Sequence, residues 1–224
     1  MERIGIVGAM GSEVELLKSK LEDCEEIKTS GRTFYLGKIN GTEAVLVCSG
    51  IGKVNSAMST QMLIDKFEVD AVINTGIAGG AGEAKIRDCV ISNEVAYHDM
   101  ELRFVAMNYP FTETFKASDK LIALAQKACD NTGIKSFVAR IATGDQFIAD
   151  KDVKADIVKR LNPSAVEMEG GAVAHVCAVN DVPFVIIRTI SDNADDGAEM
   201  SFDVFEKIAA DDAAQIVADM LKQM

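Results

Sequence analysis

Basic residues are scarce in this 224-residue chain, in which 23 lysines and arginines stand against 35 aspartates and glutamates. The formal net charge is therefore -12. Proteins that bind nucleic acid or an anionic membrane surface usually carry a basic patch. We therefore expect neither nucleic acid nor a membrane among the partners of this protein.

Long hydrophobic runs are missing as well. No segment approaches the roughly 18 consecutive apolar residues that indicate a membrane-spanning helix. The first apolar stretch, "IGIVGAMG", is followed too soon by charge to be a signal peptide. These features predict a cytoplasmic protein.

Cysteine and histidine are too few and too scattered for a metal site. The five cysteines, an odd number, include no CxxC pair, and the only histidines are His98 and His175. A zinc site needs clustered Cys and His ligands. We expect no metal, and we expect reduced thiols in place of disulfides. The cysteines are Cys24, Cys48, Cys89, Cys129 and Cys177.

What the chain does contain is apolar material in short, regularly spaced segments. Hydrophobic residues make up 48% of the sequence, and with only three prolines there is no linker-like stretch. Strand and helix patterns alternate, which predicts one α/β domain over residues 1–224 with a mixed sheet. We predict strands at 3–10, 33–39, 43–50, 71–76, 88–99, 136–144, 164–169 and 183–192. We predict helices at 12–22, 53–67, 118–132, 151–160, 170–180 and 202–223, with an irregular aromatic segment at 100–117.

Three carboxylates follow predicted strands. Glu13 comes just after the first strand, and Glu169 and Asp192 stand at the ends of the last two. Ligands of open α/β sheets bind beyond the carboxyl ends of the strands, so these acids are candidates for a common site. Taken singly, Glu13 also suits a first-turn helix acid, and Asp192 a cap or loop acid. The turns "SGIGK" and "GIAGG" lack the pattern of a P-loop.

A second acid lies two residues from Glu169, within "SAVEMEGGAVAHVCAV". Ionised carboxylates are costly to bury unless they are paired or hydrogen-bonded. Strand alternation would place Glu167 and Glu169 on one face, so one of them must lie past the end of the strand. We expect a supporting role for Glu167.

Seven motifs occur in one order along nearly the whole chain: "GIVGAMGSEVELL", "SGIGKVNSAM", "INTGIAGG", "YHD", "TGDQFI", "AVEMEGGAVAHVC" and "PFVIIRTISDNAD" followed by "MSF". Over residues 2–223 the sequence closely resembles the 5′-methylthioadenosine/S-adenosylhomocysteine nucleosidases of the nucleoside phosphorylase superfamily. The resemblance implies a three-layer α/β/α fold with a central mixed, twisted sheet. It also implies hydrolysis of the bond between adenine N9 and ribose C1′, without a cofactor, in methionine salvage and S-adenosylmethionine recycling. Substrates would be methylthioadenosine, S-adenosylhomocysteine and 5′-deoxyadenosine.

The resemblance assigns roles residue by residue. Asp192 would be the general acid at adenine N7, and Glu13 the base that deprotonates the attacking water. Glu169 and the Met168 backbone would hold the ribose hydroxyls, with Arg188 supporting Glu169. The remaining substrate-binding residues by this match are Phe147 and Ile148 at adenine, Met10, Ile51 and Phe202 at the 5′ substituent, and Gly79, Ala78 and Ser191.

Two features depart from the family. Ile77 stands where the family usually has serine, and the segment after "YHD" is shorter and different. In the family this segment helps close the 5′ pocket of the neighbouring subunit, and Leu102 and Phe104 are the counterparts in this chain. The apolar side chains of residues 100–117 also predict a homodimer. Three alternatives stay open: a phosphorolytic relative, an aminodeoxyfutalosine nucleosidase, and a non-catalytic adenosine-binding protein.

Overall fold

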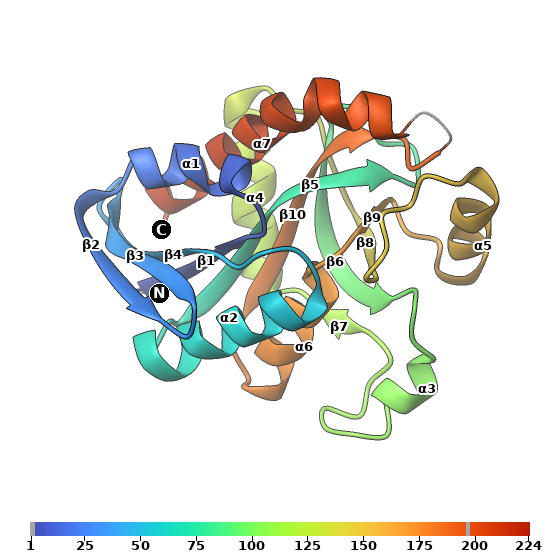
Figure 1. Ribbon diagram of the computed structural model, residues 1–224. Helices are drawn as coiled ribbons and strands as arrows, with labels where there is room; N and C mark the ends of the chain where they lie inside the picture. Colours follow the sequence, from blue (N-terminus) through green and yellow to red (C-terminus); the bar gives the residue numbers. More distant parts are fainter. Residues whose placement is uncertain (1–2, 196–197) are drawn as a thin grey trace.

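The strands form one mixed sheet in the computed structural model, which describes residues 3–195 and 198–224. The strands are β1 (Arg3–Gly8), β2 (Glu22–Thr29), β3 (Arg32–Ile39), β4 (Thr42–Cys48), β5 (Ala71–Gly80), β6 (Cys89–Tyr97), β7 (Phe115–Lys116), β8 (Ser136–Thr143), β9 (Ala165–Glu167) and β10 (Phe184–Asp192). The helices are α1 (Gly11–Ser19), α2 (Lys53–Phe67), α3 (Leu102–Val105), α4 (Asp119–Thr132), α5 (Lys151–Leu161), α6 (Gly170–Val179) and α7 (Ala198–Lys222). Helices α1, α4 and α7 lie on one side of the sheet and α2 and α6 on the other (Figure 1), which confirms the predicted three-layer α/β/α fold.

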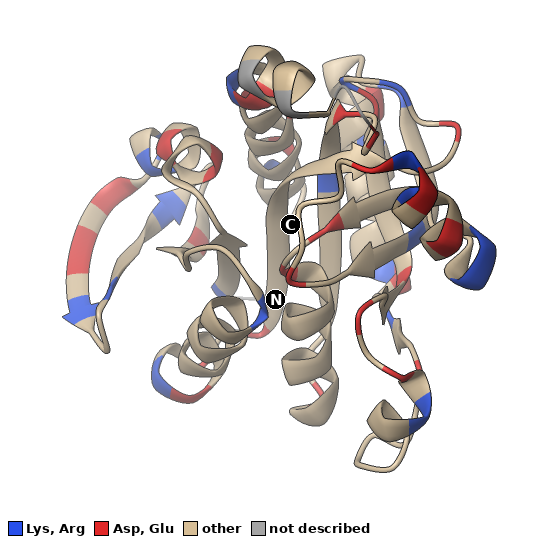
Figure 2. Ribbon diagram, turned by 45° about the vertical axis from the view of Figure 1, so that its right-hand side comes forward, with Lys and Arg blue, Asp and Glu red and all other residues tan. Residues whose placement is uncertain are grey.

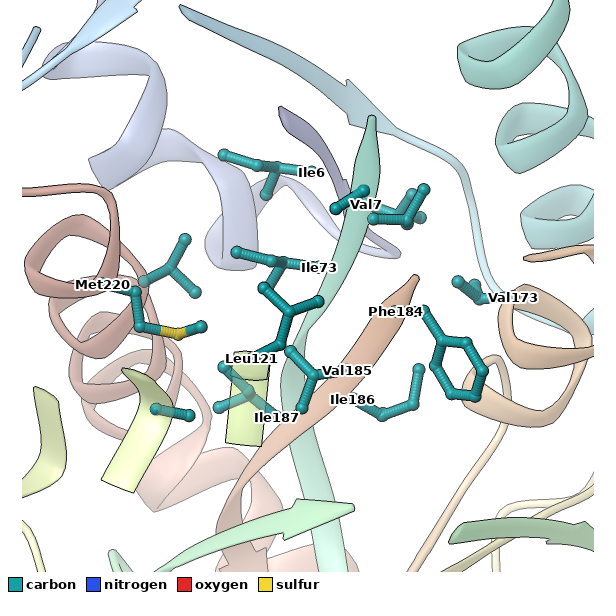
Figure 3. Close-up of a cluster of buried hydrophobic side chains, with 14 of the residues drawn as sticks. Ile6, Val7, Ile73, Leu121, Val173, Phe184, Val185, Ile186, Ile187 and Met220 are labelled. Carbon is teal, nitrogen blue, oxygen red and sulfur yellow. The ribbon is translucent and has the colours of Figure 1, made fainter. Parts of the chain in front are cut away.

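Side chains of the central strands alternate between the two helix layers. Ile6 and Ile73 lie toward Met220 of α7, whereas Ile186 lies toward Val173 of α6 (Figure 3). All five side chains are fully buried. The continuous apolar strands that the sequence shows are thus strands covered on both faces, as in parallel α/β sheets.

Part of the sheet closes on itself. Strand β1 pairs in parallel with β4 and β5, and β5 pairs in parallel with β10. From β10 the pairing continues through β6, β8 and β9 and returns to β5, with antiparallel contacts at β10–β6 and β9–β5. Strands β5, β10, β6, β8 and β9 therefore form a closed ring, and β1, β4, β3 and β2 extend the sheet away from it.

Glu13 and Asp192 follow strands that are both parallel to β5, so they share a carboxyl edge, whereas ring closure brings Glu169 to them. Because β9 runs against β5, the open-sheet argument does not apply to Glu169. In the register of the ring, Val166 pairs with Gly79, and Gly79 pairs with Asp192. The end of β9 thus meets the last part of β5 and β10, so that Glu169 and Asp192 reach the same region.

The segment Glu22–Thr29 corrects the sequence prediction. We expected a helix over residues 12–22 and no strand between residues 22 and 33, but α1 ends at Ser19 and β2 follows. Strand β2 has a single neighbour, β3, and most of its residues are exposed, so it lacks apolar alternation. The outermost strand at the left of Figure 2 is largely coloured for Asp and Glu. Charge on an edge strand discourages pairing with another chain.

Other parts of the chain also differ from the predictions. Strand β5 continues to Gly80, because the glycine-rich stretch that we predicted as a turn remains in the sheet. Helix α7 begins at Ala198, four residues early. The irregular segment 100–117 contains the short α3 and β7. All five cysteines are free.

No helix in the described part of the chain is long and apolar enough to cross a membrane. Among the same residues there is no cluster of His, Cys, Asp and Glu that could hold a metal ion.

Candidate active site

A cavity of about 310 Å³ opens where the ends of β1, β5, β9 and β10 meet the loops after β4 and β8 and the start of α7. Twelve of the residues predicted from the sequence line it: Met10, Glu13, Ile51, Ala78, Gly79, Phe147, Ile148, Met168, Glu169, Ser191, Asp192 and Phe202. Five lining residues were not among the predicted site residues: Ala9, Ile77, Gln146, Val166 and Glu167. Each of these lies within two residues of a predicted one, so neighbourhood along the chain was the signal that could have found them.

Glu13 belongs both to a helix cap and to the cavity wall. It lies in the first turn of α1 and is buried, with 4% of its surface exposed. Its Oε2 accepts hydrogen bonds from the backbone N–H groups of Ala9 (2.6 Å) and Met10 (3.0 Å). Its Oε1 accepts one from the backbone N–H of Ile77 (3.0 Å). A Cβ atom at Gly76 would overlap this carboxylate, so only glycine permits the approach.

The hydrogen bonds of Glu13 leave one acceptor position open. A carboxylate has about four lone-pair sites, two on each oxygen. The three N–H donors fill both sites on Oε2 and one on Oε1. Burial raises the pKa of Glu13, although Arg188 and the three N–H groups oppose the shift. Counting the contacts of the described residues, Glu13 is therefore a basic carboxylate with a single free site, on Oε1.

Asp192 ends β10 in a separate environment. It is 2% exposed, and its Oδ2 accepts a hydrogen bond from the Ser191 hydroxyl at 2.8 Å. Its Oδ1 accepts one from the Ala194 backbone N–H at 2.7 Å. A Cβ atom at Gly79 would lie 3.0 Å from Oδ1 and 2.8 Å from the Ala194 Cβ, which explains the glycine. Burial raises the pKa of Asp192 and so favours its protonated form.

Glu167 has the supporting role expected of it. One of its oxygens accepts from the N–H groups of Glu169 (3.0 Å) and Gly170 (2.6 Å) at the start of α6, and from Arg188 Nη2 (2.6 Å). The other accepts from the Thr143 hydroxyl. Both of its oxygens are occupied, so Glu167 caps α6 and fixes the turn that carries Glu169.

Glu169 lies past the end of β9, as alternation required, and keeps most of its acceptor sites open. Its Oε1 accepts from the Gly52 backbone N–H at 2.8 Å, and its Oε2 lies 3.7 Å from Arg188 Nη2. Burial and the neighbouring Glu167 charge raise the pKa of Glu169 to about 8.

Arg188 does not line the cavity, so its predicted place among the substrate-binding residues is corrected. It is 1% exposed and lies behind the carboxylates, where Nη2 also donates to Asn74 Oδ1 at 2.6 Å. Burial opposes its charge, yet Glu167, Glu169 and Glu13 together raise its pKa. A buried cation of this kind balances the acids around it.

Aromatic and aliphatic side chains complete the cavity. The rings of Phe147 and Phe202 meet edge to face, with centroids 5.7 Å apart. Ile77 packs with Met10 and Phe202 against two alanines of α7, Ala209 and Ala210. With isoleucine in place of the family's usual serine, this wall of the cavity is apolar. The two residues predicted for a partner's pocket, Leu102 and Phe104, do not line the cavity of their own chain.

Two buried carboxyl groups with raised pKa values, on different elements of one largely apolar cavity, suit general acid–base catalysis. The family model described as the phosphorylase superfamily matches residues 3–222, and the chain belongs to that superfamily. Within it the chain is a member of the 5′-methylthioadenosine/S-adenosylhomocysteine nucleosidases, as the motifs predicted.

Two relatives of that name support this placement, and a third similar protein has a different name. The chain is 41% identical over 230 residues to the 5′-methylthioadenosine/S-adenosylhomocysteine nucleosidase of Oceanobacillus iheyensis, covering 99% of both chains. The nucleosidase of that name from Neisseria meningitidis, solved with methylthio-immucillin-A, has a TM-score of 0.95 and 37% identity over 100% of both chains. Futalosine hydrolase of Helicobacter pylori has a TM-score of 0.91 and 35% identity over 100% of this chain and 98% of its own.

Proposed function

We propose that the chain hydrolyses the N-glycosidic bond of 5′-methylthioadenosine and S-adenosylhomocysteine, and of 5′-deoxyadenosine, releasing adenine. The observation that carries the proposal is the pair Glu13 and Asp192, buried on one cavity but held by separate sets of hydrogen bonds. The reaction would serve methionine salvage and S-adenosylmethionine recycling, and we retain the predicted cytoplasmic location.

Asp192 would protonate the leaving adenine at N7. Adenine is a poor leaving group as an anion, and protonation lets it depart while the ribose approaches an oxocarbenium ion. The raised pKa keeps the proton on Asp192 until it is needed. Hydrogen bonds from Ser191 and Ala194 fix the orientation of the carboxyl group.

Glu13 would hold the attacking water at the free site on Oε1 and accept its proton. The three backbone donors prevent the carboxylate from turning, so the water would have one position. Glu169 and the Met168 backbone would bind the ribose hydroxyls, and Phe147 would stack on adenine. Met10, Ile51 and Phe202 would surround the 5′ substituent. The logic is that of inverting glycosidases, which use one acid and one base.

Phosphorolysis fits the cavity less well than hydrolysis. No lysine or arginine is among the described residues that line it, and the Glu13 carboxylate would repel phosphate. A purely adenosine-binding protein would need neither an acid at N7 nor a base at the far face of the ribose. The likeness to futalosine hydrolase makes aminodeoxyfutalosine the second candidate substrate, because the same carboxylates would serve it.

The test is adenine release from methylthioadenosine, followed with and without inorganic phosphate. We expect release that does not depend on phosphate, with free methylthioribose as the second product. Methylthioribose 1-phosphate as product would show phosphorolysis instead. A much higher kcat/KM for aminodeoxyfutalosine than for methylthioadenosine would favour the second candidate.

We also propose a homodimer, whose interface would include the exposed apolar face of α2 and α6 and the segment 100–111. Val54 is 80% exposed on α2, and Met107 and Phe111 are each 69% exposed. Val54 and Val179 line a groove between α2 and α6. Apolar side chains gathered in this way indicate a protein interface. Leu102 and Phe104 would then reach toward the partner's cavity.

Light scattering at micromolar concentration should give the mass of a dimer. Val54→Glu should weaken the dimer by about tenfold or more, because it places an unpaired charge in the interface. Val138→Glu on β8, where the valine is 38% exposed, is the matched control and should leave the mass unchanged. A fully active monomer would contradict the proposal.

A further inference from the structure

The motif Tyr97-His98-Asp99 lies beside the cavity without lining it, and the proposed mechanism leaves it without a role. Both Asp99 carboxylate oxygens accept hydrogen bonds from Lys53 Nζ at 2.7 Å. Asp99 Oδ2 also accepts from the backbone N–H of Asp145 at 2.8 Å. The Lys53 backbone N–H in turn donates to Asp145 Oδ1 at 2.8 Å. Side chains and backbone thus form one closed set of contacts between Lys53, Asp99 and Asp145.

These contacts join two loops that contribute to the cavity. The loop between β4 and α2 carries Ile51, which lines the cavity, and Gly52, whose N–H donates to Glu169 Oε1 at 2.8 Å. The loop after β8 carries Phe147 and Ile148, which also line the cavity. A shift of either loop would therefore move a contact proposed for ribose or for adenine.

The other two residues of the motif support the same region. The His98 ring packs against Gly144, where a Cβ atom would overlap it, and the His98 backbone N–H donates to Thr143 O at 2.8 Å. The Tyr97 hydroxyl donates to Gly171 O at 3.0 Å, in the first turn of α6. The end of β6 thus contacts both the loop after β8 and helix α6, which follows Glu169.

The Lys53–Asp99 pair differs from an ordinary surface ion pair. The side chains of Lys53 and Asp99 are 23% and 16% exposed, whereas those of the Arg3–Glu43 pair are 40% and 47% exposed. Burial opposes the charge of Asp99, but hydrogen bonds from Lys53 and from the Asp145 backbone prevail and lower its pKa. Shielding from water reduces screening by salt, and backbone contacts limit the freedom of both loops.

We propose that Lys53 and Asp99 are positioning residues, which hold the loops after β4 and β8 in the arrangement that binds the nucleoside. The proposal rests on the proposed function, since it concerns binding at the same site. Neither residue would touch the substrate. They would act through Gly52 on Glu169 and through Asp145 on the loop of Phe147.

The test compares Lys53→Met with wild type, with Lys53→Arg as the conservative variant and Lys18→Met as the matched control. Lys18 also forms an ion pair, with Glu26 at 3.3 Å, on α1 and β2. We expect Lys53→Met to raise KM for methylthioadenosine and Kd for adenine by about tenfold or more, with a smaller change in kcat. The reason is that the loops after β4 and β8, which contact the bound nucleoside, would no longer be held in place before binding. Lys53→Arg should restore most of the affinity, and Lys18→Met should behave as wild type.

The salt dependence of KM distinguishes a positioning role of the Lys53–Asp99 pair from a role in the stability of the fold alone. Methylthioadenosine is uncharged, so salt should act on its binding mainly through ion pairs of the protein. Because the pair is only partly shielded, KM of the wild type should still rise at high salt, where the screening length falls to about 3 Å at 1 M, and KM of Lys53→Met should respond much less. Adding Asp99→Asn to Lys53→Met should cost little more, because the pair is already broken.

Two results would overturn the proposal. One is a Lys53→Met protein whose KM and adenine Kd stay within threefold of wild type. The other is a lowered unfolding temperature with unchanged affinity, which would make the pair structural only. Adenine binding is measured by calorimetry without turnover. If the wild type binds adenine but does not cleave methylthioadenosine, the proposed function fails, and weaker adenine binding by Lys53→Met still supports the positioning role.

Discussion

Asp192→Asn should lower kcat by about 10²–10⁴-fold, the range for a lost general acid. Asparagine keeps the size of the side chain and can still accept the Ala194 N–H, and the Ser191 hydroxyl can rotate to accept from the new amide. The fold should therefore survive, while no proton is available for adenine N7. Adenine release under saturating methylthioadenosine gives kcat, and thermal unfolding checks the fold.

The control for Asp192→Asn is Asp65→Asn on α2, an exposed position away from the cavity. It should turn over at the wild-type rate. An Asp192→Asn enzyme within threefold of wild type would remove Asp192 from the mechanism and leave only its hydrogen bonds to the turn after β10.

Glu13→Gln should lower turnover by at least about 10²-fold with a nearly unchanged KM, the pattern of an interaction used in the transition state. An amide can still hold water but cannot take its proton. The barrier would rise by more than about 2.5 kcal/mol. For the wild type, the base must be ionised and its pKa is raised by burial, so kcat/KM should fall as the pH drops through a value above the ordinary 4.5. In Glu13→Gln this acid limb should disappear.

The structure adds a stability cost to Glu13→Gln that the sequence alone does not suggest. As a simple first-turn acid, Glu13 would contribute a few tenths of a kcal/mol. In the structure, its two oxygens receive three backbone N–H groups, and a glutamine offers only one oxygen to them. At least one buried N–H would then lose its acceptor, which costs about 1–3 kcal/mol. Kinetics should be measured well below the unfolding temperature, and near-normal turnover there would make Glu13 a structural cap and reopen phosphorolysis.

The apolar strands could be predicted from the sequence because burial on both faces leaves continuous hydrophobic runs. The acids could then be located because they stand at the ends of these runs. Strand β2 could not be predicted in this way, since an exposed edge strand needs no hydrophobic run. The site was predicted largely through motif resemblance, and twelve of its residues do line one cavity. Arg188 shows the limit of this approach: the resemblance places it near Glu169, but only the structure shows that it binds Glu167 behind the cavity wall.

The closed ring of five strands also bears on when the protein acquires its activity during synthesis. Strand β10 pairs with β5, more than a hundred residues earlier in the chain, and Asp192 lies at the end of that pairing. Contacts between such distant segments form late, because a long loop of chain must first be ordered. A nascent chain emerging from the ribosome can thus pair β1, β4 and β5 while it still lacks both Asp192 and α7, the helix that covers these strands. The fold is completed only after the proposed catalytic acid has been added to the chain, so a partly made chain that ends before Asp192 should not cleave a nucleoside.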